Sequence, residues 1–106
     1  MIAENATKSI EKAVCYELQN IVKVHGPTYH SAHEGFAILM EECQEAQEDS
    51  NFMSNRLECI WHGVRDNETK TILNNLGELK LYALALAEEA VQCAAVCEKF
   101  IGSIKE

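Results

Sequence analysis

Apolar residues recur at spacings of three and four along three long segments of this chain, a pattern typical of amphipathic helices. The 106 residues include one proline and five glycines. The chain therefore has few residues for the many turns of a β-sheet protein. We predict an all-α fold of about three long antiparallel helices, in a single domain that covers residues 1–106.

Capping residues mark the expected ends of the first two helices. The first helix is predicted from about Asn5 to Val24, because Gly26 and Pro27 end its pattern. The second is predicted from Ala32 to Val64, with Ser31 and Glu34 spaced as in a capping box.

The middle of the second helix holds two weak helix formers, Ser50 and Asn51. The apolar stripes before and after them point in similar directions at about 100° per residue, so we predict one continuous helix. Two helices broken at residues 49–51 are the lesser alternative. A third helix, capped by Asp66 or Asn67, is predicted to run to about Ser103.

The third helix is apolar around most of its circumference. Between Leu81 and Cys97 only Glu88, Glu89 and Gln92 are strongly polar. A helix that is apolar all round must be covered on all sides, and two other helices in one chain can hardly do that. We therefore predict a homodimer or higher homo-oligomer, in which paired long helices build a four-helix core.

Charge and composition exclude several classes of partner. Seventeen acidic residues against nine Lys plus Arg give a net charge of −8. This argues against a general nucleic-acid binder and against binding to anionic membranes. No secretory signal or membrane-spanning segment is evident, and the five cysteines form no CxxC pair, so we expect a cytoplasmic protein with reduced, buried cysteines. Trp61 lies on an apolar stripe and is expected in the core.

Acidic residues gather on one arc of the second helix, about 100° wide. They are Glu34, Glu41, Glu42, Glu45 and Asp49. Carboxylates at such spacing can jointly hold a hard cation such as Mg²⁺. The alternative is a solvated face, since the arc lies nearly opposite the apolar stripe. Ile38, in the middle of the arc, argues against that alternative.

Glu89 lies within an apolar stripe of the third helix, where a carboxylate is costly to bury unless it is paired, protonated or bound to a metal. Together with Glu88 and Gln92 it forms a polar island. Facing the acids of the second helix, this island predicts a metal cavity between two helices. The alternative is a core salt bridge from Glu89 to one of three cations: Arg56, Lys80 or Lys99.

Two short segments resemble the motifs of the MazG-like, all-α nucleoside triphosphate pyrophosphohydrolases. Residues 41–45 (EECQE) are similar to the family pattern E-E-x-x-E, and residues 89–92 (EAVQ) to the pattern E-x-x-D on the next helix. Residues 33–42 resemble the small phage and prophage members. The resemblance covers roughly Ser31 to Ile101, and it implies long antiparallel helices that assemble as dimers or higher oligomers.

The resemblance also implies an activity. Carboxylates of this family hold Mg²⁺ (with Mn²⁺ as a substitute), the cation holds a nucleoside triphosphate, and an activated water attacks between the α and β phosphates. The products are a nucleoside monophosphate and pyrophosphate, which is nucleotide-pool housekeeping. Carried over by position, Glu42, Glu45 and Glu89 are ligands, and Glu41 is catalytic, as a further ligand or by orienting the water.

Gln92 stands where the family motif has Asp. An amide oxygen can ligate Mg²⁺ but brings no charge. As a fourth metal ligand, Gln92 would therefore bind the cation less strongly than Asp. The alternative function is a non-catalytic, oligomeric interaction protein on the same helical scaffold.

Overall fold

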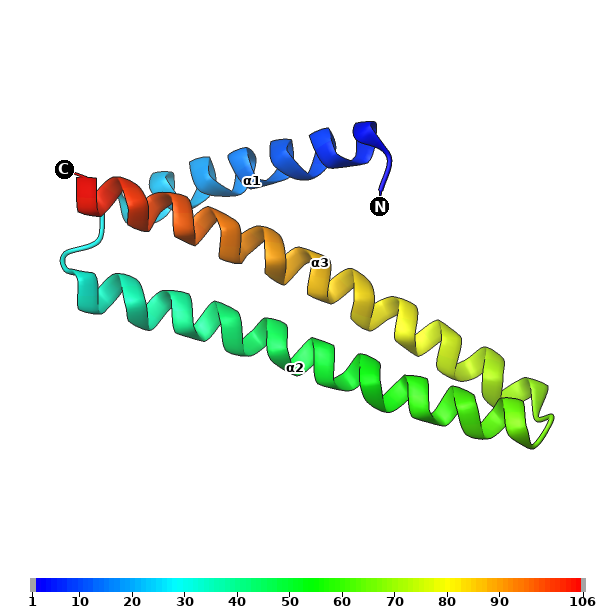
Figure 1. Cartoon of the computed structure of the whole chain (residues 1–106). Helices are drawn as coiled ribbons and strands as arrows, with labels where there is room; N and C mark the ends of the chain where they lie inside the picture. The colour runs from blue at the N-terminus through cyan, green and yellow to red at the C-terminus, as the bar shows by residue number, and fades with distance from the viewer. Residues whose placement is uncertain (1, 106) are drawn as a thin grey trace. The chain divides into compact units, whose positions relative to one another are not determined.

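The computed structural model describes residues 2–105, and this range contains three helices (Figure 1). Helix α1 spans Glu4–His25, α2 spans Ala32–Arg65 and α3 spans Thr69–Lys105. The predicted all-α fold with three helices is confirmed. In the described range, no helix has an apolar stretch long enough to cross a membrane.

Helix α2 is continuous through Ser50 and Asn51, so the prediction of one long helix is confirmed and the broken alternative is wrong. The side chain of Gln47 donates a hydrogen bond to Asn51 Oδ1 at 3.1 Å, one turn along the helix. Such pairs four residues apart stabilise a helix by a few tenths of a kcal/mol, which partly offsets the low helix propensity of Asn.

The start of α2 has one half of the predicted capping box. The backbone N–H of Glu34 donates to Ser31 Oγ at 3.2 Å, as the motif requires. The Glu34 carboxylate, however, accepts from the backbone N–H of His30 at 3.4 Å, one residue before the Ser31 N–H that the motif predicts. Glu34 thus helps to tie the loop before α2 to the first turn of that helix.

The connection from α2 to α3 differs from the prediction. Asn67 has a positive φ of 55°, and the N–H of Glu68 donates to Gly63 O at 2.8 Å, which is the Schellman ending of a helix. Glu68 caps α3, because its carbonyl accepts from Ile72 N at 3.1 Å. Capping by Asp66 or Asn67 was therefore a wrong prediction: Asn67 ends α2 instead, and α3 starts two residues later.

Contacts divide the chain into two compact units. The first consists of Met1–Cys43 and Glu89–Glu106, and thus contains α1, the start of α2 and the end of α3. The second is Gln44–Glu88, which holds the rest of α2 and α3. The single domain expected from the sequence stays a prediction.

In the first unit, the end of α3 packs against the loop that precedes α2 (Figure 1). Tyr29, Ala95, Val96 and Lys99 are buried here. The Tyr29 ring meets the ring of Phe100 edge-on, with centroids 6.0 Å apart. The backbone N–H of Tyr29 also donates to the Ser103 hydroxyl at 2.9 Å, which fixes the loop on α3.

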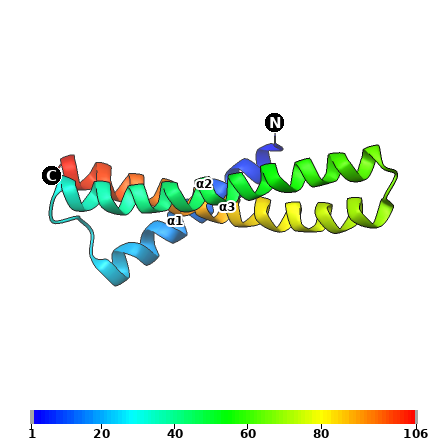
Figure 2. The ribbon, with the colours of Figure 1, turned by 90° about the horizontal axis from the view of Figure 1, so that it is seen from below.

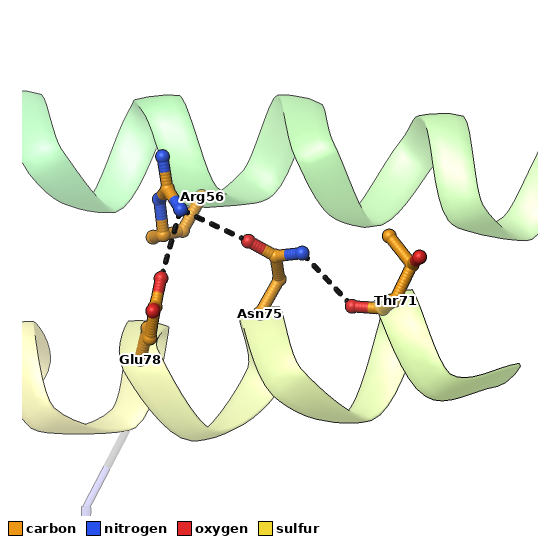
Figure 3. A network of polar contacts seen from close by, with 4 residues as sticks. All are labelled: Arg56, Thr71, Asn75 and Glu78. Carbon is orange, nitrogen blue, oxygen red and sulfur yellow. Dashed lines mark hydrogen bonds and ion pairs between the residues drawn. The ribbon is translucent and has the colours of Figure 1, made fainter. Parts of the chain in front are cut away.

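The second unit is a hairpin of two antiparallel helix segments that lie side by side (Figures 1 and 2). A polar network joins the segments (Figure 3): Arg56 donates to Glu78 at 2.8 Å and to Asn75 at 3.1 Å. Further along, the rings of Phe52 and Tyr82 stack with centroids 4.9 Å apart. Arg56, one of the three cations that the sequence offered as a partner for Glu89, therefore pairs with Glu78.

No hydrophobic side chain of the second unit is fully buried within the described chain. Trp61 is 59% exposed, so its expected place in the core of the single chain was wrong. The reason is geometric: a pair of helices covers only one side of each member, so the other apolar residues of the pair face outward. In the first unit, Cys15 and Cys43 are exposed, although buried cysteines were expected.

Two glycines of the hairpin offer a matched test of its packing. A Cβ on Gly63 would lie 2.9 Å from Ile72 Cγ1 and 3.3 Å from Ile72 N, whereas a Cβ on Gly77 meets nothing within 4 Å. We expect Gly63→Ala to lower the free energy of unfolding by about 1–3 kcal/mol through overpacking. Gly77→Ala should raise it by about 0.5–1 kcal/mol through helix propensity. Urea titrations followed by circular dichroism measure both, and a stabilising Gly63→Ala would contradict the close approach.

Candidate functional site

Two of the predicted ligands approach each other in the first unit. Glu42 on α2 and Glu89 on α3 are both half-buried, and each offers a carboxylate oxygen within 4.8 Å of the other. Ligands at about 2.0–2.6 Å from one cation lie up to about 5 Å apart, so this separation suits a shared cation. Because oxygen ligands suit hard cations, Mg²⁺ and Mn²⁺ fit this donor pair.

Gln92, one turn after Glu89, lies between these two carboxylates. Its amide nitrogen, in the orientation that the hydrogen bonds require, donates to Glu42 Oε2 and to Glu89 Oε2, each at 3.2 Å. The amide thereby offsets part of the repulsion between the two acids. To offer its oxygen to a cation instead, the Gln92 amide would have to turn over.

The other predicted site residues on α2, Glu41 and Glu45, are both exposed. Glu45 follows Glu42 by three residues, so both lie on the same side of α2, but Glu45 is exposed and belongs to the second unit. Glu41 is exposed, and its carboxylate is not among those that group this closely in the described chain. Its assignment as the catalytic residue stays a prediction.

A pocket of about 380 Å³ adjoins this pair within the first unit. All three helices and the loop before α2 line it, through eleven residues: Glu17, Ile21, His25, Tyr29, His30, Glu34, Ile38, Glu42, Gln92, Val96 and Lys99. The acidic arc of α2 therefore borders a pocket at Glu34 and Glu42, and is not simply a solvated face. Ile38 belongs to the same wall, which explains the apolar residue within the arc.

Lys99 and Tyr29 are two of the buried residues that line this pocket. Lys99 is only 4% exposed, and its ammonium nitrogen lies 4.2 Å from the centroid of the Tyr29 ring. This cation–π contact stabilises a charge that has little access to water. Burial raises the pKa of the Tyr29 hydroxyl, with smaller effects from Glu34 and Glu42, so this hydroxyl stays protonated at neutral pH.

Sequence reasoning missed these two residues as pocket residues. Lys99 follows Val96 by three positions on an apolar helix face, and a lysine on such a face is a usable signal. It was considered only as a partner for Glu89. Tyr29 lies in a short loop without periodicity, so no pattern in the sequence points to it.

Two thiols of the first unit also approach each other. Cys43 Sγ and Cys93 Sγ lie 3.7 Å apart, on α2 and α3 of the first unit. Burial raises the pKa of the Cys93 thiol to about 11, with further increases from its hydrogen bond to Cys43. Cys93 is therefore protonated at neutral pH, and the exposed Cys43 is the thiol that reagents reach first.

We expect the thiol oxidant diamide to join Cys43 to Cys93. A disulfide needs an S–S distance of about 2.05 Å, so the two sulfurs must approach by less than 2 Å from their 3.7 Å separation. Peptide mapping by mass spectrometry should find the cross-linked peptide with two hydrogens lost. Cys43→Ser should abolish it, and Cys59→Ser should leave it intact. A dominant disulfide between any other cysteines would contradict this geometry.

The chain matches no family model, no curated protein and no solved structure. Its function is therefore inferred from its own residues. The residues that carry the inference are the carboxylates of Glu42 and Glu89, the amide of Gln92 and the pocket beside them.

Proposed function

We propose that this protein is a divalent-cation-dependent nucleoside triphosphate pyrophosphohydrolase, which forms a nucleoside monophosphate and pyrophosphate. One observation carries the proposal: the carboxylates of Glu42 and Glu89 come within 4.8 Å of each other beside a pocket. Glu42 belongs to the first of the two MazG-like motifs in the sequence, and Glu89 belongs to the second. Glu45, one turn after Glu42, is the proposed third ligand, and Mg²⁺ or Mn²⁺ the proposed cation.

The protein's acidity supports a cation in this role. A chain with a net charge of −8 repels a triphosphate overall. When bound, a divalent cation supplies positive charge for the phosphate oxygens and lowers the pKa of a water molecule. In the proposed site, Glu42 and Glu89 hold that charge in place.

Part of this proposal is that the working form is a homodimer. Eight large hydrophobic residues of the second unit are at least 45% exposed: Phe52, Leu57, Trp61, Val64, Leu73, Leu76, Leu81 and Leu84. Soluble monomers rarely expose so many large apolar side chains on one short segment. A second copy of the hairpin covers them most simply, because two hairpins build a four-helix core.

The reaction products test the proposed activity. Purified protein is incubated with a panel of ribo- and deoxyribonucleoside triphosphates, with Mg²⁺, with Mn²⁺ or with EDTA. We expect one pyrophosphate and one nucleoside monophosphate per substrate consumed, and no reaction in EDTA. Release of orthophosphate with a nucleoside diphosphate, or no product from any nucleotide, would contradict the proposal.

A second candidate function rests on Gln92. Its amide already hydrogen-bonds both carboxylates at 3.2 Å, so the pair is satisfied without a cation. That arrangement favours a non-catalytic, oligomeric interaction protein on the same helical scaffold. It predicts that saturating Mg²⁺ leaves the melting temperature unchanged, whereas a bound cation stabilises the folded state.

A further inference from the structure

The pocket of the first unit extends along α2 and α3, and successive turns of the two helices supply its lining residues. On α2, Glu42, Ile38 and Glu34 follow each other at intervals of four residues. At 1.5 Å per residue, this wall runs for about 12 Å along the helix. On α3, the opposite wall is formed by Gln92, Val96 and Lys99, at intervals of four and three residues.

The two ends of the pocket differ in chemistry. At one end Gln92 hydrogen-bonds Glu42, beside Glu89. At the other end Lys99 contacts the ring of Tyr29, and the Glu34 carboxylate is close enough to raise the pKa of the Tyr29 hydroxyl. Ile38 and Val96 lie between the ends. Along the walls that α2 and α3 form, the pocket is thus polar at both ends and apolar in the middle.

We propose that this pocket takes a nucleotide lengthwise, with the phosphates at the Glu42–Gln92 end and an amino-bearing nucleobase, cytosine or adenine, at the Glu34–Lys99 end. This inference rests on the proposed function, which places the phosphates at Glu42 and Glu89. The volume of about 380 Å³ falls within the range of about 300–1,000 Å³ for small-molecule sites. Ile38 and Val96, in the middle of the pocket, suit the apolar faces of a sugar and a base.

The preference for an amino group follows from Glu34. One of its oxygens accepts from the backbone of His30, and its other oxygen accepts no hydrogen bond from the described residues. An ionised carboxylate only accepts hydrogen bonds, so it attracts an exocyclic NH₂ and repels a carbonyl oxygen. In a base that lies lengthwise, the substituent farthest from the sugar is an amino group in cytosine and adenine, and a carbonyl in uracil.

Lys99 supplies the complementary donor. Lys99 is only 4% exposed, and it lines the same end of the pocket. An ammonium only donates hydrogen bonds. The ring nitrogen next to the amino group is an acceptor in cytosine and adenine, but it carries a hydrogen in uracil. Glu34 and Lys99 together therefore match the edge of an amino-bearing base.

Cytidine and uridine triphosphates test the inference, because they differ only at this edge of the base. Pyrophosphate release is measured for both with Mg²⁺. We expect kcat/KM for CTP to exceed that for UTP by about tenfold or more, since UTP places a carbonyl against a carboxylate. Glu34→Gln should bring the ratio near one, because an amide can donate as well as accept. Gln also fits a capping box, so this variant preserves the start of α2.

Two further variants complete the test. Lys99→Met keeps a long apolar stem, and it should lower kcat/KM for CTP more than for UTP. Glu98→Gln, an exposed neighbour on α3 outside the pocket lining, serves as the charge-matched control and should keep the wild-type ratio. Equal rates for CTP and UTP, or a preference that Glu34→Gln leaves intact, would overturn the inference while the proposed function stands. No release from any nucleotide would overturn both.

Discussion

Replacement of Glu42 or Glu89 by glutamine is expected to lower kcat/KM for pyrophosphate release by about 100-fold or more. Their carboxylates lie within 4.8 Å of each other, so each variant removes one of the charges that are proposed to hold the cation and leaves the shape of the site almost unchanged. Loss of a group that stabilises developing charge costs about 10²–10³-fold in other enzymes. The measurement is steady-state kinetics at saturating Mg²⁺, repeated at higher Mg²⁺ to separate weaker metal binding from slower catalysis.

Glu48→Gln is the control for this experiment. Glu48 is an exposed acid on α2 outside the group of carboxylates, so the same change in charge should leave the rate within about twofold, as for most surface substitutions. If Glu42→Gln or Glu89→Gln kept the wild-type rate, the site assignment would be wrong even if the protein hydrolysed nucleotides.

The second large effect that we expect is on the oligomeric state of the protein. Light scattering at micromolar concentration should give twice the chain mass of 11.9 kDa. Leu81→Glu should shift the protein to the monomer, because Leu81 is 66% exposed in the chain and is proposed to be covered by the second copy. Burial of one leucine contributes about 1.5–3 kcal/mol, and a two-fold interface loses this twice. Asn74→Glu adds the same charge at an exposed polar position of the hairpin and should stay dimeric.

A monodisperse species of 11.9 kDa for the unaltered chain would contradict the assembly. It would mean that the apolar residues of the second unit face water or a different protein. It would overturn the dimeric part of the proposed function and leave the proposed cation site to be tested separately, because Glu42, Glu89 and the pocket belong to one chain.

The helices were predictable because their signals are local. Spacings of three and four, Gly26 after α1 and Ser31 before α2 each depend on a few neighbouring residues, and the observed ends lie within two residues of the predicted ones. The cap of α3 was not predictable in this way. Asn67 adopts a left-handed conformation that ends α2, and this displaces the capping role to Glu68.

The site was predictable only in part. The approach of Glu42 and Glu89 followed from two acidic motifs on successive antiparallel helices. The contact of Cys43 with Cys93 and the place of Lys99 over Tyr29 depend on the rotation of one helix against another, and on a loop without periodicity. The prediction that Trp61 lies in the core of the chain was wrong, because an apolar stripe shows only that its residues need to be buried. It does not show whether the same chain or a second copy buries them.

Binding of Mn²⁺ tests the central claim most directly. Electron paramagnetic resonance counts the free ion, so a titration of the protein with Mn²⁺ gives the number of bound ions per chain and their affinity. We predict one site per chain of millimolar or tighter affinity, weakened at least tenfold in the variant that combines Glu42→Gln with Glu89→Gln and retained in Glu48→Gln. No Mn²⁺ bound to the unaltered protein, or equal binding by the double variant, would contradict a cation site at Glu42 and Glu89.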